Sequence, residues 1–207
     1  LSKCMKKQVV YIERKFWEFV SIEKVFRRIT EGLNDEKYEI SFVQMPFGNG
    51  FTDILKNLFF FQKPKADIFH ITGHIHYLAL VLPAKKTLLT IHDLGFLHTR
   101  KGFRRLLLKK LFLDFPVKKL KYITAISEAT KAEIIKYTNC REDKIRVIQN
   151  PLRDFNNLKG NVGFSEKPMV LQVGTSPNKN VLNLIKALKG INCRVVLIGK
   201  IENELKD

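Results

Sequence analysis

Side chains that bind hydroxyl and phosphate groups recur at the ends of the apolar segments that we predict to be strands. His70, His92-Asp93, Ser127 and Asn150 occupy such positions. In a doubly wound parallel sheet, ligands bind beyond the carboxyl ends of the strands. Paired carboxylates of the kind used in acid–base hydrolysis are lacking from this set. The mixture of imidazole, hydroxyl and amide groups therefore favours a phosphorylated, hydroxyl-rich ligand.

A second candidate site is the turn at residues 174–180, which follows the apolar segment 169–173. Gly174 has no Cβ, so a ligand can approach the backbone closely there. We expect Pro177 just before or within the first turn of the next helix, where free N–H groups and Lys179 would bind a diphosphate. The turn matches neither the GxxxxGK[ST] nor the GxGxxG motif. The alternative is an ordinary strand-to-helix turn with a solvated lysine.

The sequence His92-Asp93 follows the apolar run 88–91, so we expect His92 at the carboxyl edge of the sheet. Asp93 would either cap the next turn or fix the imidazole tautomer. A purely structural His92, bonded to a loop carbonyl, is the alternative. His70, His74 and His76 invite a metal interpretation, but no cysteine or carboxylate lies close in sequence and Gly73 interrupts helical spacing, so we predict no metal.

Residues 99–122 are strongly basic, with nine Lys and Arg among apolar residues, and the whole chain carries a net charge of +17. Such a charge favours anionic partners. At helical spacing, Phe103, Leu107, Leu108, Leu111, Phe112 and Phe115 form one apolar stripe. The segment could lie on an anionic membrane surface, or it could be a core-facing helix with a solvated basic face. We expect no nucleic-acid partner, because no recognised binding motif accompanies the charge.

The elements that position these residues form an alternating pattern. Apolar, Val/Ile-rich segments at 8–13, 38–45, 66–72, 86–92, 121–127, 144–149, 169–174 and 193–199 read as strands. Helical periodicity fills most of the gaps between them, with Ser21 and Ser127 as N-cap candidates. Apolar strands interleaved with helices predict an α/β fold with a Rossmann-like, doubly wound parallel sheet.

The pattern divides the chain into three parts. Residues 1–152 form an N-terminal domain, 153–168 lose periodicity and read as a linker, and 169–207 begin a second domain as one βαβ unit. We therefore expect a fragment of a longer protein. No apolar run reaches the roughly 20 residues of a membrane span, and the three scattered cysteines are typical of a reduced, cytoplasmic protein.

Six segments taken in order resemble the GT-B glycosyltransferases of group 1, family 4, which include mannosyl- and rhamnosyltransferases of cell-surface polysaccharide synthesis. They are "ADIFHITG", "TLLTIHDLGFL", "YITAISEATKAEI", "KIRVIQNPL", "VLQVGTSPNKNVLNLIKAL" and "CRVVLIG". The resemblance covers roughly residues 8–200, and its specificity lies in the succession of motifs. It implies two Rossmann-like domains facing a cleft, with the acceptor mainly on the first and a nucleoside-diphosphate sugar mainly on the second.

The resemblance also implies roles for particular residues. His92 would face the donor sugar, Gly174, Thr175 and Lys179 would hold the donor phosphates, Ser127 would open a cleft-facing helix and Asn150 would mark the interdomain crossing. Asn178 stands where many relatives carry arginine. Transfer would be metal-independent, without a cofactor, and retaining, to a glycan or lipid-linked acceptor.

The resemblance is incomplete in two places. The glycine-rich loop common after the first strand is replaced by "RKFWEFVSIEKVF", and the paired-glutamate motif lies outside the sequence. The chain by itself is then expected to be inactive. Two rival classes remain: a non-catalytic basic module that binds anionic membrane or nucleic acid, and a different GT-B-like or epimerase-like enzyme acting on nucleotide sugars.

Overall fold

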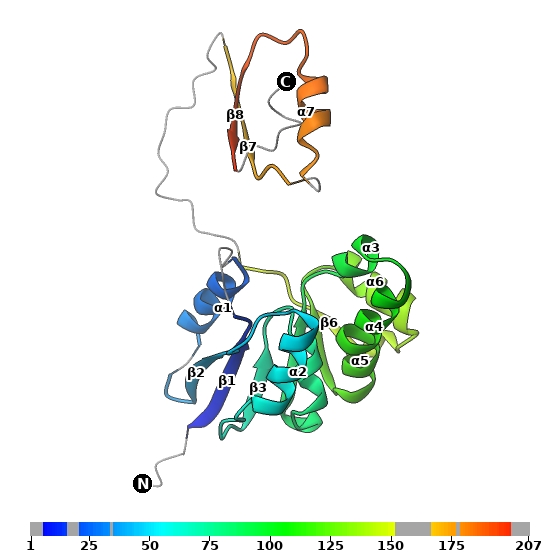
Figure 1. The fold of residues 1–207 in the computed structure, drawn as a ribbon. Helices are drawn as coiled ribbons and strands as arrows, with labels where there is room; N and C mark the ends of the chain where they lie inside the picture. Colours follow the sequence, from blue (N-terminus) through cyan, green and yellow to red (C-terminus); the bar gives the residue numbers. More distant parts are fainter. Residues whose placement is uncertain (1–5, 16–20, 34, 152–166, 177–178, 200–207) are drawn as a thin grey trace. The chain divides into compact units, whose positions relative to one another are not determined.

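The computed structural model describes residues 6–15, 21–33, 35–151, 167–176 and 179–199. It separates into two compact units, Leu1–Arg153 and Asp154–Asp207, coloured along the chain in Figure 1. The predicted linker, 153–168, lies almost entirely outside the described residues. Each unit is a parallel α/β structure, so the predicted fold class is confirmed.

The first unit is built on a six-stranded parallel sheet with the order β2-β1-β3-β4-β5-β6. Its strands are β1 (Lys7–Glu13), β2 (Tyr38–Gln44), β3 (Ile68–Ile71), β4 (Thr87–Ile91), β5 (Tyr122–Ala125) and β6 (Ile145–Val147). All six lie within or next to the segments expected from sequence. Because every strand runs the same way, their carboxyl ends meet at one edge of the sheet.

Helices connect the strands. They are α1 (Ser21–Glu31), α2 (Phe51–Phe60), α3 (Gly95–Thr99), α4 (Gly102–Lys109), α5 (Phe115–Lys119) and α6 (Glu128–Thr138), with short 3-10 turns at η1 (His76–Leu80), η2 (Ala84–Lys86) and η4 (Glu142–Lys144). A π-helical turn, η3 (Lys110–Asp114), joins α4 to α5. No helix in the described part of the chain is both long and apolar enough to cross a bilayer.

The two faces of the sheet are covered unequally. On one face, a large core joins Ile12, Phe69, Leu89 and Ile91 to residues of α2, η1, η3, α5 and α6. On the other face, the described part of the chain supplies only α1, over the β2-β1-β3 side, where Phe26 packs against Tyr11, with Phe42 beside them. Parallel sheets are normally covered on both faces, so the β4–β6 part of this face is the exception.

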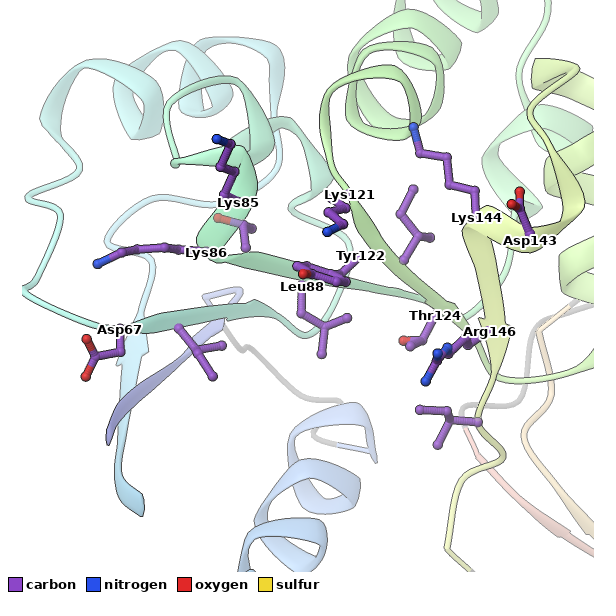
Figure 2. Close-up of a pocket in the computed structure, with 14 residues that line it drawn as sticks. Asp67, Lys85, Lys86, Leu88, Lys121, Tyr122, Thr124, Asp143, Lys144 and Arg146 are labelled. Atoms are coloured by element: carbon purple, nitrogen blue, oxygen red, sulfur yellow. The ribbon is translucent and has the colours of Figure 1, made fainter. Parts of the chain in front are cut away.

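The uncovered face carries a cavity of about 660 Å³. Figure 2 shows Leu88, Tyr122 and Thr124 on its floor, with basic side chains around it. Its lining includes Lys85, Lys86, Lys121, Lys144 and Arg146. His92, Asp93 and Asn150 are not part of this lining, so this cavity is not the one that the sequence predicts for chemistry.

The second unit consists of β7 (Met169–Val173), α7 (Val181–Ala187) and β8 (Arg194–Ile198). The two strands are parallel neighbours, with Met169 opposite Arg194 and Val173 opposite Ile198. This is the βαβ unit that the sequence predicts after residue 168. Cys140 in the first unit and Cys193 in the second are free thiols.

The basic segment 99–122 is not one stripe. Phe112 is buried and Leu108 and Leu111 pack against the core, whereas Phe103 and Phe115 are exposed. The extra residue of the π-helical turn shifts the angular position of every later residue. The expectation of a single apolar stripe is therefore wrong, because the helix changes its pitch in the middle of the segment.

Candidate active site

A cavity of about 480 Å³ lies at the carboxyl edge of the first unit. Its lining is Arg14, Ser21, Ile22, Val25, His74, His92, Asp93 and Asn150. Arg14 follows β1, His74 follows β3, and His92 and Asp93 follow β4. The structure thus brings together His92, Asp93 and Asn150 as expected, with Arg14 and His74, which also follow strands, and with Ser21 at the start of α1.

Two hydrogen bonds hold His92, one at its ring and one at its backbone carbonyl. Its Nε2 lies 2.9 Å from the carbonyl oxygen of Thr72, so this nitrogen carries the proton and donates. The hydroxyl of Thr130 donates to the carbonyl oxygen of His92 at 3.2 Å. With Nε2 fixed as the donor, a neutral ring leaves Nδ1 as a hydrogen-bond acceptor.

The electrostatic setting keeps His92 neutral. Burial lowers the pKa of its ring below the ordinary value, and the charges of His74 and Arg14 act in the same direction. Burial also lowers the pKa of His74, against the opposing effect of Asp93. A neutral imidazole with a free acceptor nitrogen can orient a ligand hydroxyl without placing a cation beside it.

Asp93 does not hold the imidazole of His92. Its Oδ1 accepts a hydrogen bond of 2.9 Å from the backbone N–H of Gly95, and its Oδ2 lies 3.8 Å from Nε2 of His74. Of the two roles expected for Asp93, the structure gives it the turn-capping one. The Thr72 carbonyl fixes the tautomer of His92 instead.

Arg14 brings a permanent positive charge to the cavity, positioned by a carboxylate behind it. Its Nε lies 2.9 Å from Oε1 of Glu23, which is 5% exposed. A second pair, Arg27 with the buried Glu13 at 2.8 Å, lies at the same end of β1. Burial raises the pKa of Glu13, and Arg27 opposes that rise. Arg14 directly follows β1, which is the position in sequence that places it at this edge.

Ser127 supports the site from behind and does not line the cavity. Its hydroxyl accepts from the backbone N–H of Thr130 at 3.1 Å and so caps α6, as expected. It also contacts the hydroxyl of Thr130 at 3.0 Å, and Thr130 in turn bonds the carbonyl of His92. Ser127 therefore acts through Thr130.

His70 is not at the carboxyl edge. It lies inside β3, its Nε2 bonds the hydroxyl of Thr90 at 2.8 Å, and its ring stands edge-on to Phe26 at 4.9 Å. Burial lowers its pKa to about 3. The expectation of a cleft residue is wrong, because the strand continues one residue further than His70 and the ring packs under α1.

The histidines that invite a metal interpretation have separate partners. His76 is 1% exposed and donates from Nδ1 to the carbonyl of Phe112 at 2.7 Å, while His70 bonds Thr90. Among the described residues, no three His, Cys, Asp or Glu side chains lie close enough together to hold a metal ion.

The turn after β7 differs from the expected one in two respects. The helix begins at Val181, with Asn180 before it in the left-handed conformation, so it starts later than Pro177 would imply. Gly174 has φ +86°, and a Cβ there would lie 3.2 Å from Cγ and Cε of Lys179. The missing Cβ thus accommodates the lysine side chain. Pro177 and Asn178 lie outside the described residues.

The turn after β7 lies beside the end of β8, and its backbone is held by hydrogen bonds. The Gly174 N–H donates to the carbonyl of Ile198 at 2.7 Å, and the Lys179 N–H donates to that of Ser176 at 2.8 Å. Gly199, after β8, has φ +149°, and a Cβ there would lie 2.8 Å from the hydroxyl oxygen of Thr175. Lys179 is exposed and sits over the end of β7.

Comparison with known proteins gives the family. Residues 22–153 match the model of Glycosyltransferase Family 4. The match covers more than half of the chain and includes the cavity residues except Arg14 and Ser21. No curated protein shows a significant match. The six-stranded parallel sheet is consistent with the Rossmann-like domain of a GT-B protein. The chain belongs to glycosyltransferase family 4.

Proposed function

We propose that this protein transfers a hexose from a nucleoside-diphosphate sugar to a glycan or lipid-linked acceptor, with retention at the anomeric carbon and without a metal. The observation that carries this proposal is the cavity at the carboxyl edge, where neutral His92 stands beside Arg14 and Asn150 within a glycosyltransferase family 4 domain. Polysaccharide synthesis and transfer of mannose or rhamnose follow from the sequence resemblance and are part of the proposal.

His92 has the geometry to orient a sugar. Its Nε2–H is committed to the Thr72 carbonyl, so Nδ1 is the atom that would accept a hydrogen bond from a sugar hydroxyl. As the diphosphate leaves, positive charge develops near the anomeric carbon, and a neutral ring adds no repulsion there. Burial, which lowers the pKa of His92, maintains that state.

In this proposal, Arg14 and Lys179 each bind an anionic group of a substrate. Arg14, oriented by Glu23, would bind a phosphate or carboxylate of the ligand in the first unit. In the second unit, Lys179 with Gly174 and Thr175 would bind the donor diphosphate. We propose the same role for Asn178 from its place in the turn. These assignments make residues 1–152 the acceptor domain and the segment after 168 the start of the donor domain.

Transfer is tested on the full-length protein with a panel of radiolabelled nucleoside-diphosphate hexoses and membrane-extracted acceptors, in EDTA. The proposal expects sugar incorporation or slow donor hydrolysis that survives chelation. Activity that appears only with added divalent metal would contradict the metal-independent part. Isolation of a β-linked product from an α-linked donor would contradict retention.

We also propose that residues 99–122 contact an anionic membrane surface from the cytoplasmic side. Arg104 and Lys110 are exposed, and Phe103 and Leu106 beside them are 76% and 51% exposed. Arg105 and Lys109 are committed elsewhere, to the carbonyl of Leu97 and to Asp114. Of these four residues, only Arg104 and Lys110 are therefore expected to bind lipid headgroups.

This contact is tested by vesicle sedimentation with two matched double variants. Arg104→Gln with Lys110→Gln is expected to weaken binding to phosphatidylglycerol vesicles by about 1 kcal/mol per charge. Arg105→Gln with Lys109→Gln removes the same charge from residues that already have partners, and is expected to change binding less. Equal binding by the wild type and the Arg104/Lys110 variant would contradict the contact.

A further inference from the structure

Helix α2 is apolar on both of its faces. Its inner face places Ile54 and Leu58 in the core of the first unit. Its outer face carries Phe51, Leu55 and Phe59, spaced four residues apart, which are 58%, 43% and 82% exposed. Residues at i, i+4 and i+8 lie along one side of a helix, so the three form a continuous stripe. Phe60 beside it is 68% exposed.

The orientation of α2 is fixed by a polar anchor. Asn57 is fully buried; its side-chain oxygen accepts from the N–H of Phe47, and its Nδ2 donates to the carbonyls of Phe47 and Gly48 and to the hydroxyl of Tyr77. Rotating the helix to bury the aromatic residues would break these bonds in the interior, which is costly. The fold therefore holds an asparagine inside and the stripe outside.

An aromatic stripe of this size calls for a partner. Single exposed apolar residues are ordinary, but contiguous apolar patches mark interaction sites. The surrounding charges are mostly positive: Lys56 on the helix and Lys63 and Lys65 after it, against Asp53 in the first turn. A second copy would bring another chain of net charge +17 against this one, which repulsion opposes.

We propose that the stripe of α2 inserts into the interface of an anionic lipid bilayer. Phenylalanine and leucine side chains on a convex helix, flanked by lysines, match the pattern of helices that lie in the plane of a membrane. The lysine heads would stay at the level of the headgroups while their apolar stems lie along the surface. This inference is independent of sugar transfer and of the basic segment, since it concerns apolar insertion by a different helix.

The test uses the whole chain with vesicles of phosphatidylcholine containing about one third phosphatidylglycerol. The triple variant Phe51→Gln, Leu55→Gln, Phe59→Gln is expected to lower the partition coefficient roughly tenfold or more, because binding scales with the apolar area buried. Its circular dichroism spectrum should match the wild type, since all three side chains are exposed. The matched control is Tyr122→Gln with Ile148→Gln, which are 47% and 57% exposed on the uncovered sheet face and should change binding less than about twofold.

A fluorescence measurement gives a direct readout of insertion. Trp17 is the single tryptophan of the chain, so Trp17→Phe provides a silent background. Phe59→Trp in that background is expected to shift to the blue on vesicle addition and to be quenched by brominated lipid, whereas Ile148→Trp should do neither. Because the α2 effect is apolar, it should persist at salt concentrations that abolish the effect of Arg104→Gln with Lys110→Gln.

Three results would overturn the proposal. The first is vesicle binding by the triple variant equal to that of the wild type. The second is a Phe59→Trp emission that lipid does not change. The third is a dimer in sedimentation velocity that the triple variant abolishes without any change in vesicle binding, which would assign the stripe to a second copy of the chain.

Discussion

At the scale of single residues, the site depends on which atoms are already committed. The carbonyl of Thr72 takes the Nε2 proton of His92, and Glu23 takes one edge of Arg14. His92 thereby keeps Nδ1 as the ring atom that can accept a hydrogen bond from a ligand. His70 and His76 also have one ring nitrogen engaged, with Thr90 and with the backbone of Phe112, but of the three histidines only His92 lines the cavity.

His92 is the residue whose loss should affect turnover most. We expect His92→Ala in the full-length protein to lower kcat by roughly 100-fold, because a bond that strengthens in the transition state is lost. Affinity for the nucleoside diphosphate should change much less. Steady-state kinetics and calorimetry on one preparation check both values. A lower melting temperature with near-normal turnover would instead make His92 a structural residue.

Lys179 should affect binding more than turnover. If it neutralises the donor diphosphate, Lys179→Ala weakens nucleoside-diphosphate affinity by about 1.5–3 kcal/mol, the value of a charge-assisted hydrogen bond. Lys186→Ala, which removes an exposed lysine from the last turn of α7, is the matched control and should leave affinity unchanged. Calorimetric titration of both variants with the diphosphate decides, and equal affinities would refute the phosphate role.

At the scale of elements, α6 links helix capping to the site. Ser127 caps the helix, Thr130 in its first turn bonds the carbonyl of His92, and the two hydroxyls lie 3.0 Å apart. A change at the start of α6 therefore reaches His92 through two hydrogen bonds. Neither residue lines the cavity, so the effect is one of positioning.

Ser127→Ala should lower both stability and turnover. Loss of an N-cap costs about 1 kcal/mol, which corresponds to a melting point lower by roughly 2–4 °C in a domain of this size. Turnover should fall severalfold with an unchanged Michaelis constant, because Thr130 loses its partner. Ser127→Asp restores the cap without the hydroxyl donor and should recover the melting point alone. Recovery of both by Ser127→Asp would show that the cap alone accounts for the loss of turnover, and would contradict a role for the bond between the hydroxyls of Ser127 and Thr130.

At the scale of the whole molecule, the sequence pattern was sufficient for the sheet. Val- and Ile-rich segments between polar ends marked the eight strands of the described residues, because strands of a parallel α/β sheet are mainly apolar. The sequence offers an N-cap candidate for α1 and α6, at Ser21 and Ser127, but none for α2, which begins after Gly50 without a side-chain cap. That Phe51, Leu55 and Phe59 lie on the exposed side of α2 depends on the buried Asn57, whose partners Phe47, Gly48 and Tyr77 are distant in sequence.

The sequence predicts where the site residues lie better than it predicts the hydrogen-bond partners of their side chains. Residues that follow strands must meet at one edge, so His92, Asp93 and Asn150 were found together. Which partner each side chain takes depends on residues distant in sequence: Thr72 is twenty positions from His92, and Glu23 nine from Arg14. The misplacement of His70 has the same origin, because a single position at the end of β3 decides between core and edge.

Buried neutral histidines should make the stability of the first unit depend on pH. His76 is 1% exposed, and burial lowers its pKa to about 3, against an unfolded value of 6.5. Between these two values the unfolded chain binds a proton that the folded chain does not. The free energy of unfolding therefore falls as the pH drops below 6.5, by about 1.4 kcal/mol per pH unit from this residue.

His76→Asn isolates that contribution. The asparagine amide can donate to the carbonyl of Phe112 as Nδ1 does, but it does not titrate. We expect the variant to be less stable than the wild type at pH 7.5, because it fills the site less well, and the gap to close by roughly 1.4 kcal/mol per unit between pH 6.5 and 5. Urea unfolding at each pH measures the difference, in which the titration of every other group cancels. A gap that stays constant across this range would mean that His76 takes up its proton in the folded protein, and that the Phe112 carbonyl stabilises a charged ring.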